Sequence, residues 1–119
     1  MFNVTGDTIE ISRGDTGAVK FTATGYTFVS EDRALFSIKT PQGTVVKQSA
    51  YPLDENGSFT VYFFNHDTDQ LPAGNNYTWD VRYVLHPYYE EAGNIIDGNQ
   101  VITPKLPMSM RIFSVVGEI

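Results

Sequence analysis

The sequence contains no cysteine among its 119 residues. Neither a disulfide framework nor a thiolate metal site can form without cysteine, and a reducing compartment suits such a chain. Only two histidines are present, His66 and His86, and each lies in or beside an expected loop without a second histidine nearby. A metal site built on them would need carboxylates gathered from distant segments, so we predict neither a metal nor a cofactor.

Basic residues are scarce as well. Eight lysines and arginines stand against fourteen acidic residues, for a net charge of −6, and the basic residues form no cluster of the kind that neutralises phosphates. Nucleic acid is therefore not an expected partner. The N-terminal stretch "MFNVTGDTIEIS" has neither a basic region nor an apolar segment, which predicts no signal peptide and no membrane anchor. We expect a product made in the cytoplasm, with no membrane partner.

The motifs that mark common enzyme classes are missing: the chain has no Gly-x-Ser-x-Gly elbow, Walker loop or dinucleotide fingerprint. The acidic stretches Asp67–Asp69 and Asp54–Gly57 resemble fragments of calcium loops, but neither continues with spaced ligands and a closing glutamate. Helix capping and turn formation explain both. Paired carboxylates that meet only in space leave no sequence signature. A small acidic domain without an evident cleft is a poor candidate for them, so we predict no enzymatic activity.

What the sequence does contain is apolar residues that alternate with polar ones, interrupted at short intervals by Gly, Pro, Asn and Asp. This period of two is typical of β-strands. The clearest run predicts one buried face made of Tyr77, Trp79, Val81 and Tyr83, with Trp79 as the core anchor. Further inward positions are Ile9, Ile11, Val19, Phe21, Ala23, Phe36, Ile38, Met108, Met110 and Ile112. Residues 59–64 are apolar on both faces, which predicts a central strand.

These segments amount to about seven strands with turn signals between most neighbours. Pro41–Gly43 and Asp54–Ser58 are the expected tight turns. One helical turn is expected near Asp67, which would serve as its N-cap. A chain of this length is the commonest size for one domain. We therefore predict a single all-β domain over residues 1–119, an immunoglobulin-like antiparallel β-sandwich.

The tripeptide Arg13-Gly14-Asp15 matches a known integrin-binding signature. It lies directly between two short predicted strands, however, and Thr16 and Gly17 complete a compact turn. We interpret it as a structural turn, in which Gly14 takes a positive φ, Asp15 accepts local backbone hydrogen bonds and Arg13 pairs with a carboxylate. Integrin binding is not expected.

The connection over residues 86–107 is long for a compact domain. Gly93-Asn94 and Asp97-Gly98 are turn dipeptides, so part of it is expected to fold back as a small hairpin. Its apolar residues would then form a surface for a partner or for self-association. Alternatively, they cap one end of the core, and both readings remain open. These residues are Tyr88, Tyr89, Ile95 and Ile96.

The segments "IEISRGDTGAVKF", "LPAGNNYTWDVRYV" and "NIIDGNQVITPKLPMSMRIFSVVGEI" together cover most of the chain. In this order they resemble small immunoglobulin-like domains of phage and prophage proteins from Gram-positive bacteria, including the N-terminal domain of baseplate upper proteins. The matching positions are Ile9, Ile11, Arg13, Gly14, Asp15, Tyr77, Trp79, Asp80 and Val81.

The resemblance implies a non-enzymatic structural or assembly component of a phage tail or baseplate. Its partners would be other phage structural proteins or further copies of itself, and its final location would be the virion. The alternative function is a carbohydrate-binding module, in which exposed Tyr and Trp rings stack on sugars while Asp and Asn bind hydroxyls. Burial of Tyr77, Trp79 and Tyr83 would remove the strand platform that this alternative needs.

Overall fold

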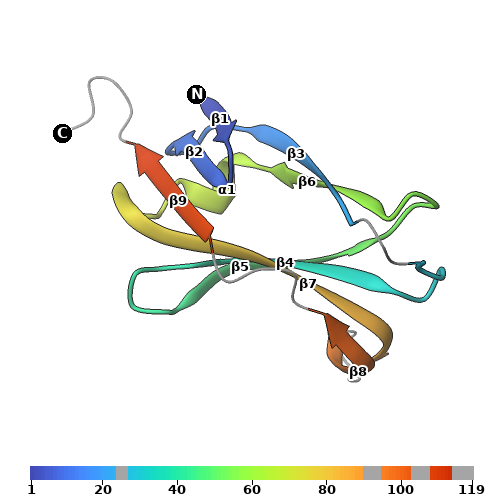
Figure 1. Ribbon diagram of the computed structural model, residues 1–119. Coiled ribbons are helices and arrows are strands. Elements are labelled where there is room, and N and C mark those ends of the chain that lie inside the picture. Colours follow the sequence, from blue (N-terminus) through green and yellow to red (C-terminus); the bar gives the residue numbers. More distant parts are fainter. Residues whose placement is uncertain (24–26, 90–94, 103–107, 114–119) are drawn as a thin grey trace.

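Strands dominate the computed structural model, which describes residues 1–23, 27–89, 95–102 and 108–113 (Figure 1). For residues 86–89, 95–102, 108 and 109 it describes the backbone alone. The strands are β1 (Phe2–Thr5), β2 (Thr8–Ser12), β3 (Gly17–Thr22), β4 (Arg33–Lys39), β5 (Val45–Pro52), β6 (Ser58–Phe63), β7 (Gly74–Tyr89), β8 (Ile95–Ile102) and β9 (Met108–Phe113). The one helix of these ranges is α1 (Asn65–Thr68). No helix in the described ranges is both long and apolar enough to cross a membrane.

The strands form two sheets. The larger has seven strands in the order β1-β2-β9-β7-β4-β5, with β8 also paired to β7, and the smaller consists of β3 and β6. The all-β prediction is confirmed, and the described residues hold nine strands where about seven were expected. The prediction of wholly antiparallel pairing is wrong at one place, because β2 and β9 run parallel with Ile9 opposite Met110. Strands so far apart in the sequence can meet in either direction, since no short turn joins them.

The two sheets face each other across a core that is largely aromatic. Phe21 of the small sheet lies 5.2 Å from Trp79 of the large sheet, measured between ring centroids. Phe63 meets Phe36 edge to face at 5.9 Å. The predicted inward faces are confirmed, since the following residues are all buried: Ile9, Ile11, Phe36, Ile38, Tyr77, Trp79, Val81, Tyr83, Met110 and Ile112. Val19, Phe21 and Ala23 are partly buried against this core, while the side chain of Met108 lies outside the described part.

The prediction that residues 59–64 form a central strand is wrong. In the described chain β6 pairs with β3 alone, so it belongs to a two-stranded sheet. Phe59, Val61 and Phe63 point into the core, but Tyr62 and Phe64 are each 54% exposed. Apolar residues on both faces allow a strand to be buried on both faces. They do not determine which strands lie beside it.

Helix α1 begins one turn earlier than the sequence suggested. Its N-cap is Phe64, so the predicted N-cap Asp67 is instead the third helical residue. The Asp67 carboxylate accepts a hydrogen bond from the Phe64 N–H at 2.7 Å, which is the return contact of a capping box. The same oxygen pairs with Lys47 Nζ of β5 at 3.2 Å, with both side chains buried. The Asp67–Lys47 pair therefore ties α1 to the large sheet.

Both predicted tight turns are present. Gly43 and Gly57 have φ angles of 88° and 74°, the left-handed conformation that favours glycine. Asp54 Oδ1 accepts hydrogen bonds from the N–H groups of Asn56 and Ser58, each at 2.9 Å. Asp54 is thus occupied by turn formation, as the sequence predicted.

The described parts of the long connection after His86, residues 86–89 and 95–102, are strand rather than loop. β7 continues to Tyr89 and β8 returns beside it, which confirms the predicted fold-back as a hairpin. The reversal falls between Tyr89 and Ile95, in residues outside the described part that include Gly93-Asn94. The second predicted turn is wrong, because Asp97 and Gly98 lie inside β8.

Replacing Trp79 by Ala should destabilise the protein by about 3–5 kcal/mol, because it removes a large ring that contacts both sheets. Chemical unfolding followed by circular dichroism measures this loss. The control is Tyr62→Ala, which removes an exposed aromatic ring from the outer face of β6. It should change the free energy of unfolding by less than about 0.5 kcal/mol. Equal losses in the two variants would contradict the assignment of Trp79 as the core anchor.

Candidate functional site

The Arg13–Asp15 turn links the ends of the described chain. Backbone hydrogen bonds join Ser12 N–H to the Met1 carbonyl at 2.9 Å and Arg13 N–H to the Phe113 carbonyl at 2.8 Å. Gly14 has a φ of 82°, as the structural-turn interpretation requires. The turn therefore lies against β1 and β9 instead of standing at the tip of a long loop.

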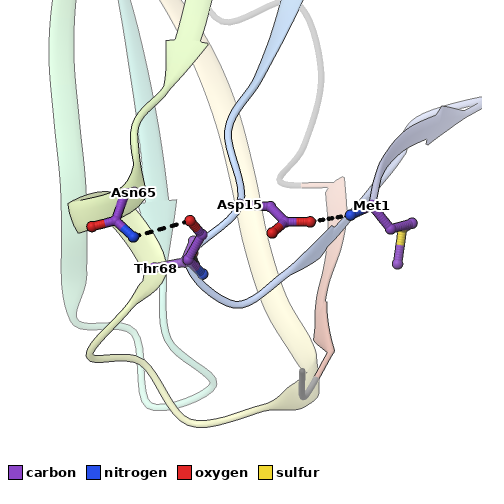
Figure 2. A network of polar contacts seen from close by, with 5 residues as sticks. Met1, Asp15, Asn65 and Thr68 are labelled. Atoms are coloured by element: carbon purple, nitrogen blue, oxygen red, sulfur yellow. Dashed lines mark hydrogen bonds and ion pairs between the residues drawn. The ribbon is translucent and has the colours of Figure 1, made fainter. Parts of the chain in front are cut away.

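Helix α1 holds the other side of this turn (Figure 2). The Gly14 N–H donates to Thr68 Oγ1 at 2.8 Å, and Asn65 Nδ2 donates to the Gly14 carbonyl at 3.2 Å. The Arg13 guanidinium donates to the Leu71 carbonyl at 3.2 Å. Both polar groups of the Gly14 backbone are thus bonded to α1, which fixes the orientation of the turn.

Asp15 differs from its predicted role. The sequence suggested that its carboxylate accepts local backbone hydrogen bonds, whereas the structure pairs it with the N-terminal ammonium group of Met1 (Figure 2). The two side chains are 40% and 38% exposed. The acidic group that an integrin-type motif would present to a metal is therefore engaged within the chain.

The end of β7 and the strand β8 form a two-stranded ribbon. β4 accompanies β7 only as far as Val84, opposite Arg33. From Leu85 to Tyr89, β7 pairs with β8 alone among the described strands. Five residues at roughly 3.3 Å each give the ribbon a reach of about 16 Å beyond β4. Figure 1 shows the ribbon on the side of the molecule away from the N-terminus.

The ribbon contains the four residues proposed as a partner surface. Tyr88 stands opposite Asp97, and Tyr89 opposite Ile95, with a register shift between the two pairs at Ile96. The structure thus brings these residues together on one pair of strands. Their side chains lie outside the described part, so the choice between a partner surface and a core cap stays a prediction.

A lateral cleft of about 330 Å³ opens between the two sheets. Its floor consists of Trp79, Val81 and Tyr83 of β7, and residues 19–22 of β3 form one wall. Val4, Gly6 and Asp7 of the β1–β2 hairpin form the opposite wall. Trp79 Nε1 donates a hydrogen bond to the Asp7 carbonyl at 3.0 Å, which fixes the indole ring beneath this hairpin.

The sequence did not reveal the cleft, because three segments far apart in the chain build it. One signal was available. The dipeptide Gly6-Asp7 follows the alternating residues Phe2 and Val4, a pattern typical of a hairpin. This signal predicts a strand at β1 that pairs with residues 8–12. It does not predict that β1 lies opposite β3.

The aromatic residues of β7 offer no open stacking platform. Tyr77, Trp79 and Tyr83 are 4%, 5% and 4% exposed, so none of them presents an open ring face at the outer surface. Burial raises the pKa of the Tyr83 hydroxyl. Burial also raises the pKa of Tyr77, with a smaller opposing effect from the nearby Arg13 charge. The strand-based sugar platform considered from the sequence is therefore not available.

The described residues contain no group of three or more His, Asp or Glu side chains able to hold a metal ion. His66 has a side chain that is 78% exposed, 3.7 Å from the Asp67 carboxylate. Its ring stacks on Phe64 with a centroid distance of 5.9 Å. The side chain of His86 lies outside the described part.

A comparison of the chain with known protein families, with curated proteins and with solved structures found no match.

The contact between Gly14 and α1 can be tested at Thr68, which is fully buried. Thr68→Val keeps the shape of the side chain but removes the oxygen that accepts from the Gly14 N–H, and should cost about 1–2 kcal/mol of stability. Thr68→Ser keeps the hydroxyl and is the matched control. Urea unfolding measures both. A valine variant as stable as wild type would show that the hydrogen bond does not hold the turn.

Alkaline pH should destabilise the protein through its buried tyrosines. Because burial raises the pKa of Tyr83 in the folded state, the unfolded chain loses this proton first, and stability falls as pH rises above about 10. Tyr83→Phe should reduce the fall in melting temperature between pH 8 and pH 11. Tyr62→Phe changes an exposed ring and should leave that fall unaltered. Equal pH dependence in all three proteins would refute the role of Tyr83.

Proposed function

We propose that the protein is a non-enzymatic structural or assembly component of a phage or prophage tail or baseplate. It would be made in the bacterial cytoplasm, act through contacts with other phage structural proteins or with its own copies, and end in the virion. Its fold would be an immunoglobulin-like β-sandwich, in which the β3–β6 sheet covers the inner face of the large sheet. The phage assignment rests on the resemblance of three segments, which include Ile9–Asp15 and Tyr77–Val81.

The observation that supports an assembly role is the β7–β8 ribbon. From Leu85 to Tyr89 the ribbon extends about 16 Å beyond β4, and its outer edges have no neighbouring strand in the described part of the chain, so they are open to a partner. Isolated two-stranded hairpins are marginally stable in water, so a partner that covers the ribbon would stabilise it. Adjacent tyrosines and an Ile-Ile pair supply contact area at low cost in side-chain entropy.

The proposal predicts that the ribbon mediates self-association. The double variant Tyr88→Ser with Ile96→Ser should keep the melting temperature of the wild type but reduce the average mass at high concentration. The matched control is Tyr62→Ser with Phe64→Ser, which removes two exposed aromatic rings elsewhere on the surface. Light scattering over a concentration series, beside a thermal melt, measures mass and stability together.

Three outcomes would count against this proposal. A fall in melting temperature for the ribbon variant would identify Tyr88 and Ile96 as a core cap. A wild type that is monomeric at every concentration would refute self-association. Binding of an oligosaccharide that disappears in the ribbon variant would favour the carbohydrate-binding alternative, with Tyr88 and Tyr89 in place of the buried strand aromatics.

A further inference from the structure

The hydrogen bonds of β3 alternate between its two edges. The strand pairs antiparallel with β6, and the Ala23 N–H donates to the Gly57 carbonyl at 3.0 Å at the end of this ladder. In antiparallel pairs the hydrogen-bonded residues recur at every second position. Gly17, Val19 and Phe21 are therefore the residues of β3 whose N–H and C=O groups point toward β6.

The backbone groups of the alternate residues of β3 face the opposite way. The N–H and C=O groups of Ala18, Lys20 and Thr22 point to the free edge of β3, where the described chain provides no neighbouring strand. All three residues are exposed. A row of unpaired backbone donors and acceptors on a strand edge is the surface that an added strand binds.

The lateral cleft lies directly beside this edge, because residues 19–22 form one of its walls. Its volume of about 330 Å³ is at the lower end of the range for ligand sites and would accommodate a few apolar side chains. Side chains of a strand alternate between its two faces. A strand added to β3 would therefore direct every second side chain toward the floor made by Trp79, Val81 and Tyr83.

The positive charge of Lys20 determines which kind of strand can pair with this edge. Lys20 is the only charged residue of β3, and it has no ion-pair partner among the described residues. Like charges directly opposite each other on paired strands are destabilising, whereas opposite charges are favourable. If β3 of a second copy paired here with its Lys20 opposite this Lys20, the two positive charges would repel each other. A strand with a carboxylate opposite Lys20 is therefore favoured.

We propose that the free edge of β3 and the adjoining cleft bind an extended segment of a partner polypeptide. This segment adds to β3 as a strand, buries alternate apolar side chains against Trp79 and Tyr83, and places a carboxylate beside Lys20. The site does not include the β7–β8 ribbon. Failure of self-association through the ribbon and failure of strand binding at β3 are therefore separate results.

The probe is the capped hexapeptide Thr-Val-Glu-Val-Thr-Val, titrated into the full chain. In the free protein, the amides of Ala18, Lys20 and Thr22 should exchange with solvent at least about tenfold faster than those of Val19 and Phe21, because only the latter bond to β6. Saturating peptide should slow amide exchange at Ala18, Lys20 and Thr22 by a similar factor. Trp79 is the single tryptophan and lines the cleft, so a change in its fluorescence is a second measure of peptide binding there.

Charge exchange provides the matched control. Lys20→Glu should weaken binding of the glutamate peptide by roughly fivefold and strengthen binding of a peptide with lysine at that position by a similar factor. Both variants of the peptide should leave the exchange rates of β5 amides unchanged.

Three results would overturn the proposal. One is the absence of any shift in Trp79 fluorescence or amide exchange at millimolar concentrations of both peptides. Another is binding that protects β1, β5 or the ribbon while the β3 amides stay unprotected. The third is protection of Ala18, Lys20 and Thr22 that grows with protein concentration in the absence of peptide, because a second copy would then cover the edge.

Discussion

The small β3–β6 sheet depends on ring packing across the core. Two strands alone are marginally stable in water, so this sheet has to be held by the larger one. Phe21 supplies the contact: its ring lies 5.3 Å from Phe59 in its own sheet and 5.2 Å from Trp79 in the other. Trp79 in turn stacks on Phe36 of β4. The position of every surface carried by β3 and β6 follows from this aromatic cluster.

The polar contacts close one end of the molecule and leave one side open. At the closed end, the Arg13–Asp15 turn bonds to α1, and the buried Lys47–Asp67 pair bonds α1 to β5. Along the open side, the hydrogen bond from Trp79 Nε1 to the Asp7 carbonyl joins β7 to the β1–β2 hairpin beside the cleft. The turn is therefore a structural element, whereas the cleft is the opening at which we propose that a partner segment binds.

Alternation in the sequence identified which residues face the core, because a period of two is a local property of the chain. It identified Trp79 and the buried face of β7 for that reason. It could not identify strand neighbours, which tertiary contacts decide, so β6 was placed at the centre of a sheet and the parallel pairing of β2 with β9 was missed. The cleft escaped prediction for the same reason, since β1, β3 and β7 meet there only in the folded chain.

The place of β9 also has a consequence for synthesis on the ribosome. β9 lies between β2 and β7, so among the described strands the N-terminal hairpin joins the large sheet only through β9, which is made after the other eight. Ile9 can pair with Met110 only after β9 has been made, and contacts between residues so far apart in the sequence form slowly. Until then the facing edges of β2 and β7 stay open, and open edges of nascent chains invite pairing with other molecules. The large sheet is therefore complete only after translation has passed Phe113, and until then a strand of another molecule would meet the same two edges that β9 later occupies.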